Sequence, residues 1–290
     1  MIYPARYFYL VALRQKGFLM KRTNLVVLTE CSIMVALSAV LSIVPIFEMP
    51  YGGSITLASF LPIVIIAYRH GIKCGLAGAG ASSIVQMLFG MKNFSYFTTW
   101  QSLVALALLD YVVAFTVFGL AGVFRKKIKQ QSAAMVTGAA LASVVRYICH
   151  VISGATVWAG LSIPTEAAIL YSLSYNATYM IPETIILVLS SAYVGASLDF
   201  RGKLPTRMKS EKLDKTSSLC LIFAGLAVLA GLITDTVLVF SKLQNYDSGE
   251  FMITALADVN WLLVGIITGI CALIAAALAV VVKLRQNKEA

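Results

Sequence analysis

Four polar residues lie deep inside apolar stretches of the chain, where polar side chains are rarely found without a use. They are an acid, a guanidinium, an imidazole and an amide: Asp110, Arg146, His150 and Asn176. An ionisable group in hydrocarbon is costly unless it faces the protein interior, a partner or water. Side chains of this kind at a similar depth predict a ligand cavity inside a helical bundle. The alternative is a structural cluster of hydrogen bonds that holds helices together.

One apolar stretch carries a stripe of such residues at helical spacing. Arg146, His150, Gly154 and Trp158 recur every four residues, so on a helix they share one slowly drifting face. Gly154 removes a side chain from the middle of this face and opens space for a ligand. A lone Trp at a helix end is usually an interfacial anchor, and a lone His is usually a core residue. Their combination with an arginine favours a binding site.

The depths of the polar residues converge in the outer half of the membrane. At 1.5 Å per residue, Asp110 and Arg146 lie about 14 Å and about 20 Å from opposite ends of their helices, so the two charges can pair. The next helix brings Tyr171 to about 8 Å and Asn176 to about 15 Å, whereas Glu183, at about 25 Å, is expected to serve helix packing. One carboxylate, aromatic faces and a few hydrogen-bonding groups suit a flat, cationic heteroaromatic ligand.

The elements that position these residues are membrane helices. The chain has 290 residues, of which 59% are hydrophobic and 12% charged, and this excludes an ordinary soluble domain. Because backbone amides must be satisfied internally in lipid, we expect an all-α integral membrane protein with about eight transmembrane helices. The apolar stretches cover residues 24–47, 54–69, 72–91, 101–124, 133–161, 166–199, 217–241 and 254–283, the second being short.

The distribution of basic residues predicts the orientation of the chain. If the N-terminus is cytoplasmic, 20 of the 23 Lys and Arg residues fall on the inner side, as the positive-inside rule requires. Both termini are therefore expected in the cytoplasm. The net charge of +10 reflects this asymmetry and anionic inner-leaflet lipid rather than nucleic-acid binding.

The chain divides into four parts. We expect a cytoplasmic segment at 1–23, a six-helix ligand-binding membrane domain at 24–199, a basic cytoplasmic linker at 200–216 and two further helices with a short tail at 217–290. The segment before Met20 lacks the cleavage site of a signal peptide. We expect it to be an interfacial extension or the product of a misplaced initiation codon.

Several functional classes are not supported by any motif. The chain has no G-x-x-x-x-G-K-[ST], H-E-x-x-H or G-x-S-x-G sequence, so we expect neither an enzyme nor ATP hydrolysis by this chain. Two histidines are too few for a usual metal site, the five cysteines show no C-x-x-C pair, and no cofactor is expected.

Motifs on three helices together resemble the thiamine-binding subunit, or S component, of energy-coupling factor transporters. The resemblance spans about Thr29 to Gly195 and rests on Leu109-Asp110-Tyr111, on Arg146-Tyr147 with His150, Gly154 and Trp158, and on Tyr171-Ser172-Leu173-Ser174-Tyr175-Asn176. It implies a six-helix bundle in a bacterial plasma membrane that captures thiamine at the outer face. It also implies a transmembrane coupling subunit and two cytoplasmic ATPases as partners.

The resemblance also implies roles for individual residues. Asp110 would balance the thiazolium and hold the aminopyrimidine, and His150 and Trp158 would stack on the rings. Tyr171 and Asn176 would hydrogen-bond the ligand. The rest of the cavity lining would come from Tyr111, Gly154 and Trp100, with Arg146 beside Asp110. Ser32 and Ala36, a small-residue pair on the first helix, would meet the coupling subunit; packing within the chain is the alternative for this common spacing.

The chain departs from the family pattern at four positions. Asp110 stands for an expected Glu, Arg146 for a Lys, Gly53 for a lid-loop Trp and Trp100 for a Tyr. These departures leave a related pyrimidine or another vitamin open as the ligand. A second hypothesis, from a different class, is a stand-alone secondary carrier coupled to protons or sodium through Asp110, Arg146 and Glu183.

Overall fold

The computed structural model describes residues 25–49, 51–161, 165–208, 215–243 and 252–289, and in this part of the chain the protein is mainly helical. The predicted segment 1–23 lies outside the described residues. The helices before the linker are Leu25–Ile43, α2 (Leu61–His70), α3 (Ile72–Phe89), α4 (Trp100–Leu106), α5 (Ala114–Thr116), α6 (Gln131–Thr156) and α7 (Ala168–Ser197). Two long helices follow the linker, α8 (Lys215–Leu243) and α9 (Trp261–Glu289). Short 3-10 helices occupy Met91–Tyr96, Val117–Phe124 and Ile253–Asp258.

Seven helices in the described residues are long and apolar enough to cross a membrane, which confirms the helical membrane fold. The second expected span, 54–69, is different. It begins as strand β2 (Ser54–Ile55), which pairs antiparallel with β1 (Phe47–Glu48), and only then becomes the 10-residue helix α2. Ten residues rise about 15 Å, half of the hydrocarbon thickness. Gly71 ends α2 with φ of +86°, so the helix cannot continue into α3.

The fourth expected span is one continuous helical path with a change of winding. Trp100–Leu106 is α-helical, Ala107–Val113 forms a π-helical turn, and the chain returns to α-helix at Ala114 before it tightens to 3-10 geometry. A π turn inserts an extra residue and is frequent at functional sites. Asp110 and Tyr111 both lie in this turn.

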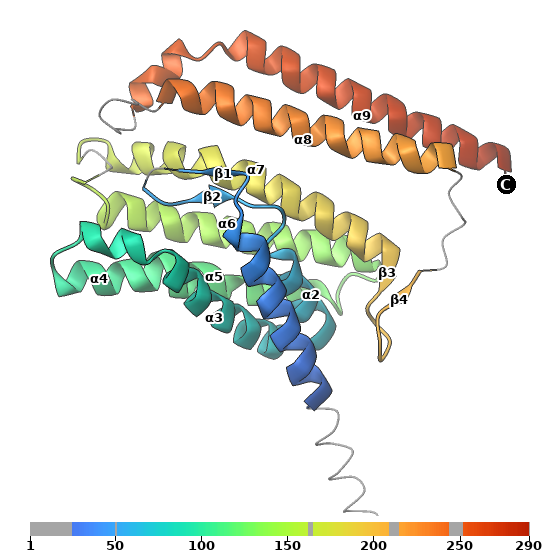
Figure 1. Ribbon diagram of the computed structural model, residues 1–290, viewed down its shortest axis with the longest axis horizontal. Coiled ribbons are helices and arrows are strands. Elements are labelled where there is room, and N and C mark those ends of the chain that lie inside the picture. The colour runs from blue at the N-terminus through green and yellow to red at the C-terminus, as the bar shows by residue number, and fades with distance from the viewer. Residues whose placement is uncertain (1–24, 50, 162–164, 209–214, 244–251, 290) are drawn as a thin grey trace, which may run out of the picture.

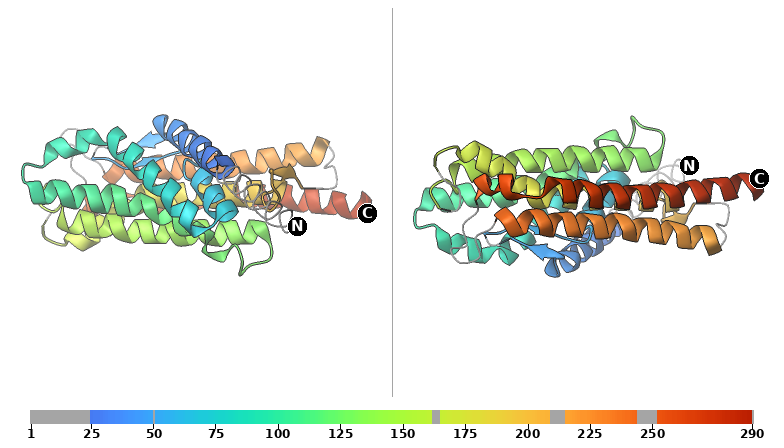
Figure 2. Two further views of the ribbon diagram at one scale, coloured as in Figure 1. Left: turned by 90° about the horizontal axis from the view of Figure 1, so that it is seen from below. Right: turned by 90° about the horizontal axis from the view of Figure 1, so that it is seen from above.

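The long helices are arranged as a bundle with a helical hairpin along one side. In Figure 1, α6 and α7 run side by side through the bundle, and α8 and α9 lie together along the side of α7. Figure 2 shows the same pair covering α7 when the molecule is seen from above. Exposed apolar side chains such as Leu262 and Leu273 lie along α9, and none of its most apolar 18-residue stretch is buried.

Small residues let the helices of the bundle approach closely. A Cβ at Gly138 of α6 would overlap the backbone of Ala121, and a Cβ at Gly122 would overlap the backbone of Ala67. Without a hydrophobic driving force between helices in lipid, such close packing is a main source of helix association. A core of fully buried side chains surrounds these contacts, including Val64, Phe118, Met135 and Leu187.

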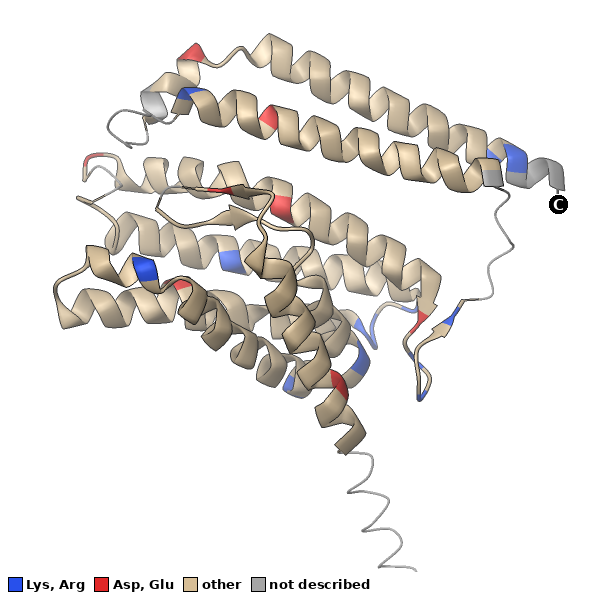
Figure 3. Cartoon of the chain, in the orientation of Figure 1, with Lys and Arg blue, Asp and Glu red and all other residues tan. Residues whose placement is uncertain are grey.

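The predicted linker 200–216 is partly folded. β3 (Leu198–Asp199) and β4 (Thr206–Arg207) pair antiparallel, and Arg69 of α2 donates hydrogen bonds to the carbonyls of Phe200 and Gly202 at 3.1 and 3.0 Å. The other side of the Arg69 guanidinium binds Glu30 through two hydrogen bonds of 2.6 and 2.8 Å. Glu30 is therefore not the solvated carboxylate that its position near a span end suggests. Figure 3 shows basic residues gathered around this end of the bundle.

Candidate ligand pocket

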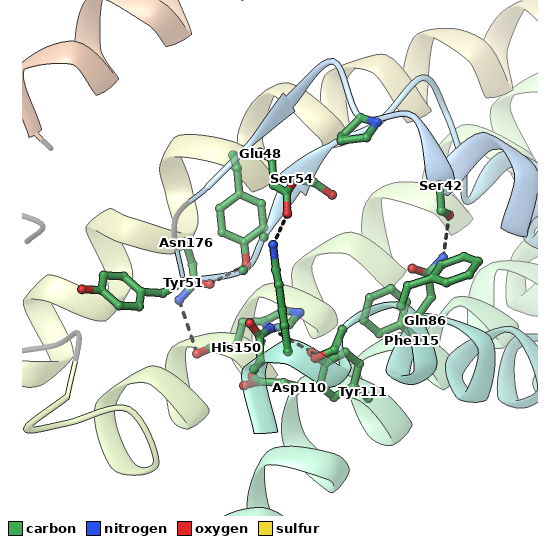
Figure 4. A pocket seen from close by; sticks show the side chains of 18 of the residues that line it. Ser42, Glu48, Tyr51, Ser54, Gln86, Asp110, Tyr111, Phe115, His150 and Asn176 are labelled. Carbon is green, nitrogen blue, oxygen red and sulfur yellow. Dashed lines mark hydrogen bonds and ion pairs between the residues drawn. The ribbon is translucent and has the colours of Figure 1, made fainter. Parts of the chain in front are cut away.

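A pocket of about 500 Å³ opens between the bundle helices and the β1–β2 hairpin. Its walls come from α6, α7, the π turn and the 3-10 helix Met91–Tyr96, and the hairpin with its connecting turn forms a lid. Figure 4 shows Glu48, Tyr51 and Ser54 of the lid on one side, facing Asp110, Tyr111 and His150 on the other. This volume is within the range of small-molecule sites.

Asp110 is the centre of the polar network. Its Oδ1 lies 3.0 Å from His150 Nδ1, and its Oδ2 accepts a hydrogen bond of 2.8 Å from the indole Nε1–H of Trp158. The π turn directs the carboxylate toward His150 of α6 and toward Trp158, which follows the end of α6. When Nδ1 of His150 carries the hydrogen, Nε2 is an acceptor. This buried Nε2 has no hydrogen-bond partner in the described part of the chain, so its hydrogen-bonding capacity is unused there.

Trp158 reaches the pocket from a turn and not from the helix stripe that the sequence suggests. α6 ends at Thr156, and the amides of Val157 and Trp158 both donate to the carbonyl of Ser153. The indole packs edge-on against Phe97 at a centroid distance of 4.9 Å and tilts against Tyr96 at 5.9 Å. The result is an aromatic corner beside the carboxylate.

Asn176 lies at the pocket wall on α7, as the depth argument expects. Its amide nitrogen donates to the carbonyls of Ser172 at 2.9 Å and His150 at 3.3 Å, and its Oδ1 accepts from the hydroxyl of Tyr179 at 2.7 Å. Tyr175 also lines the pocket and donates to the Gly52 carbonyl of the lid at 3.0 Å. Helical spacing identifies this face, because residues 172, 175, 176 and 179 follow the i, i+3, i+4, i+7 pattern.

Arg146 does not pair with Asp110, contrary to the expectation from depth. Its guanidinium forms an ion pair with Glu183 of α7, and both side chains are buried. Glu183 also accepts a hydrogen bond of 2.8 Å from Thr56, just after the lid. Depth along separate helices cannot decide between two acids, because the rotation of each helix sets which side chains face each other. The packing role predicted for Glu183 thus includes neutralising the arginine.

The wall opposite α7 contains residues that the sequence did not single out. Asn93 donates a hydrogen bond of 3.0 Å to the hydroxyl of Tyr111, which donates in turn to the carbonyl of Gly90 at 3.1 Å. Asn93 Oδ1 is buried without a partner in the described residues. The short helix that carries Asn93 has no strong periodicity, so no sequence signal marks it.

Contacts at its tip and its rim hold the lid on the side of the pocket mouth. Glu48 and Lys92 form an exposed ion pair across the pocket mouth, and Tyr51 contacts Tyr96 edge-on at 5.8 Å. Gly52 and Gly53 have φ of +93° and +90°, a conformation that glycine adopts without strain. A Cβ at Gly53 would lie 2.8 Å from the ring of Tyr179. The Tyr179 ring therefore occupies the space beside the position where the family resemblance leads us to expect a lid Trp.

The structure brings together seven of the nine residues predicted to bind the ligand, and two do not line the pocket. Those that line it are Asp110, Tyr111, Arg146, His150, Gly154, Trp158 and Asn176. Trp100 begins α4 and is 70% exposed. Tyr171 lies five residues before Asn176, which places it on another side of α7. Ser32 and Ala36 are exposed on the helix Leu25–Ile43, and nothing in the structure tests their role with a partner.

Gly154 serves helix packing as well as the pocket. A Cβ at this position would overlap Ser172 Oγ and lie 3.0 Å from Ser172 Cβ. The space that the missing side chain leaves is therefore largely filled by α7. The expectation that Gly154 simply opens room for a ligand needs this correction.

The groups that line the pocket are suited to ligand recognition. Among the described residues, no group of three or more His, Cys, Asp or Glu side chains could hold a metal ion. The lining offers an acid, an imidazole, an amide, tyrosine hydroxyls and aromatic faces. These groups can hold a cationic ring by charge, stacking and hydrogen bonds.

A protein-family model for thiamine transporter proteins matches residues 28–198 of the chain. The chain belongs to this family. The match covers the helices that build the pocket and ends before α8, so α8 and α9 lie outside it.

Two known proteins are similar to this chain, and the first of them supports the assignment. The thiamine transporter ThiT of Bacillus subtilis strain 168 is 35% identical over 202 residues, which cover 65% of this chain and 97% of that protein. The solved structure of ThiT from Listeria monocytogenes is 22% identical with a TM-score of 0.49, and the alignment covers 59% of this chain and 94% of that chain. Family membership and the seven apolar helices make the chain a multi-pass membrane protein of a transporter family.

Proposed function

We propose that the chain captures thiamine in the lidded pocket and hands it to partner subunits for import. The support from relatives is the family match and the identity to a protein named as a thiamine transporter. The support from the site is the distribution of charge around Asp110.

Asp110 is the acid of the pocket that a cationic ligand can use. Among the described residues, Glu48 pairs with Lys92 at the rim and Arg146 pairs with Glu183 at the floor. The carboxylate of Asp110 has His150 and Trp158 as partners but no Lys or Arg. Because no permanently charged cation lies against it, the carboxylate can offset the charge of a thiazolium in a poorly hydrated site. This observation carries the proposal.

The remaining contacts are assigned from the lining. Trp158 and Tyr111 provide ring faces, and the unpartnered Nε2 of His150 accepts a hydrogen bond from the exocyclic amine of the aminopyrimidine. Asn176 and its neighbour Tyr179 supply polar atoms on the α7 wall. Aspartate is one methylene shorter than the expected Glu, and the π turn helps to compensate by directing it toward α6.

The driving force is proposed to come from partners. The sequence contains no P-loop motif, so ATP hydrolysis belongs to two cytoplasmic ATPase subunits that act through a transmembrane coupling subunit. The exposed Ser32 and Ala36 on the first helix are the proposed contact with the coupling subunit, in a bacterial plasma membrane with both chain termini in the cytoplasm. The basic end of the bundle (Figure 3) supports this orientation, because positively charged loops stay on the cytoplasmic side.

A binding and uptake experiment tests the proposal. The purified chain should bind thiamine and show a change in tryptophan fluorescence, and it should not bind a nucleoside of similar size. Reconstituted alone in vesicles it should bind thiamine without accumulating it, and uptake should need the partner subunits and ATP. Uptake by the chain alone that collapses with a protonophore would instead identify a secondary carrier.

A further inference from the structure

The first of the two C-terminal helices, α8, reaches the lid of the pocket. Phe240, near the end of α8, packs edge-on against Phe47 of β1 with a centroid distance of 4.9 Å and an interplanar angle of 80°. Phe240 is 4% exposed, whereas Phe223 on the same helix is 58% exposed. The end of α8 is thus buried at the place where it meets the lid.

This contact continues the apolar core of the pocket. Phe240 and Leu243 of α8 belong to one buried cluster with Met49 and Ile55 of the lid region and Tyr179 of the pocket wall. A small cavity of about 80 Å³ separates the lid, α7 and α8, and it is lined by side chains such as Phe47, Ile186 and Leu232. The lid therefore lies between the ligand pocket on one face and α8 on the other.

The other ties of the lid are the apolar packing of Met49 and Ile55 on its inner side, the contact of Tyr51 with Tyr96, and three polar contacts. The Glu48–Lys92 ion pair is exposed, and pairs of this kind contribute little. At the tip, Tyr175 donates one hydrogen bond to the carbonyl of Gly52. The base of the lid is fixed by the hydrogen bond from Thr56 to Glu183. The outward face of β1 then depends on apolar contact with α8, because Phe47 would otherwise face lipid or water.

We propose that Phe240 is a positioning residue for the lid, and that the C-terminal hairpin of α8 and α9 holds the lid closed over the pocket. The inference rests on the proposed function in that thiamine is the ligand whose entry and release the lid controls. A lid held from behind opens less often, so α8 slows both entry and release. Because α8 supports the lid with and without ligand, it changes the association and dissociation rates more than their ratio, Kd.

The first test does not need a ligand. Hydrogen–deuterium exchange of the amides between Ile46 and Ile55 is measured in the full chain, in lipid nanodiscs, for Phe240→Ala and for the matched control Phe223→Ala. We expect exchange in the lid to rise about 2- to 10-fold in Phe240→Ala, as the loss of one aromatic pair predicts, and to stay unchanged in Phe223→Ala. Exchange in α6 reports on global folding.

A second variant separates lid positioning from damage to α8. Phe47→Ala breaks the same contact from the lid side, and the double variant Phe47→Ala/Phe240→Ala should raise exchange no further than the larger single effect. Lid exchange equal to wild type in Phe240→Ala, or effects of the two substitutions that multiply, would overturn the proposal. If Phe240→Ala also loosens α8 itself, lid exchange in Phe47→Ala and in the double variant decides whether this contact holds the lid.

The kinetic test then uses thiamine and stopped-flow tryptophan fluorescence. Phe240→Ala should speed both association and dissociation by about 2- to 10-fold, with a smaller change in Kd. Unchanged rates would mean that the lid does not limit exchange of the ligand. If the wild-type chain binds no thiamine, the proposed function fails, while the exchange experiment still decides whether α8 holds the lid.

Discussion

Arg146 and Glu183 form an ion pair at the floor of the pocket, in which the two side chains are 7% and 5% exposed. The guanidinium also lies 4.7 Å from the ring centroid of Phe60 and 4.9 Å from that of Phe115. Because Glu183 binds Thr56 as well, the pair connects α6 and α7 with the base of the lid. Arg146 of α6 and Glu183 of α7 can both be buried here because each neutralises the charge of the other.

The first prediction concerns this pair. Glu183→Gln keeps the shape and the hydrogen bond with Thr56 but leaves the buried arginine without its counter-charge. Removing one partner of a buried pair costs about 3–5 kcal/mol, so thermal unfolding in detergent should occur at a clearly lower temperature. Glu48→Gln breaks the exposed pair at the rim and should change stability by less than about 1 kcal/mol. Equal losses of stability in Glu183→Gln and Glu48→Gln would show that the buried pair stabilises the protein no more than the exposed pair does.

The second prediction concerns the charge of Asp110. Asp110→Asn preserves the size of the side chain and one hydrogen-bond acceptor, but it removes the negative charge from the pocket. Charge-assisted contacts are worth about 1.5–3 kcal/mol, so thiamine should bind at least about tenfold more weakly by titration calorimetry. A neutral aminopyrimidine fragment should lose less. If both ligands lose the same affinity, the acid acts by holding His150 and Trp158 and not by its charge.

The third prediction separates two of the tryptophans. Trp158 lines the pocket and donates to Asp110, whereas Trp100 is mostly exposed and outside the lining. Trp158→Phe should remove most of the thiamine-induced fluorescence change and weaken binding by about 1 kcal/mol through the lost hydrogen bond. Trp100→Phe should leave both unchanged. Loss of the signal in Trp100→Phe would place the ligand at the outer end of α4 instead.

The sequence predicts the membrane helices and most of the pocket because both depend on local pattern. Long apolar stretches determine the spans, and polar residues inside them are rare enough to mark the site. The four-residue spacing correctly groups Arg146, His150 and Gly154 on one face of α6. Trp158 joins them although the helix ends first, because the turn after Thr156 directs the indole back to Asp110.

Features that arise from packing between segments were not predictable. The π turn at Asp110 contains neither Pro nor Gly, so no local sequence signal predicts the change of helix type. The partner of Arg146 depends on the rotation of α6 against α7. The lid depends on pairing between β1 and β2, which are two residues each, too short for an alternating pattern. For the same reason, the sequence alone predicts one membrane span over 54–69, where the structure has β2 and the short helix α2.

The last prediction concerns Gly154, where α6 and α7 approach each other. A larger residue here meets Ser172 before it reaches the ligand, since a Cβ would overlap Ser172 Oγ. Gly154→Leu should therefore separate the two helices, lower the thermal stability and abolish thiamine binding together. Gly225→Leu is the matched control, because a Cβ at Gly225 of α8 meets no atom within 4 Å, and it should unfold and bind like the wild type. A Gly154→Leu protein that is fully stable but does not bind would mean that the side chain points into the pocket and that α7 does not fill this space.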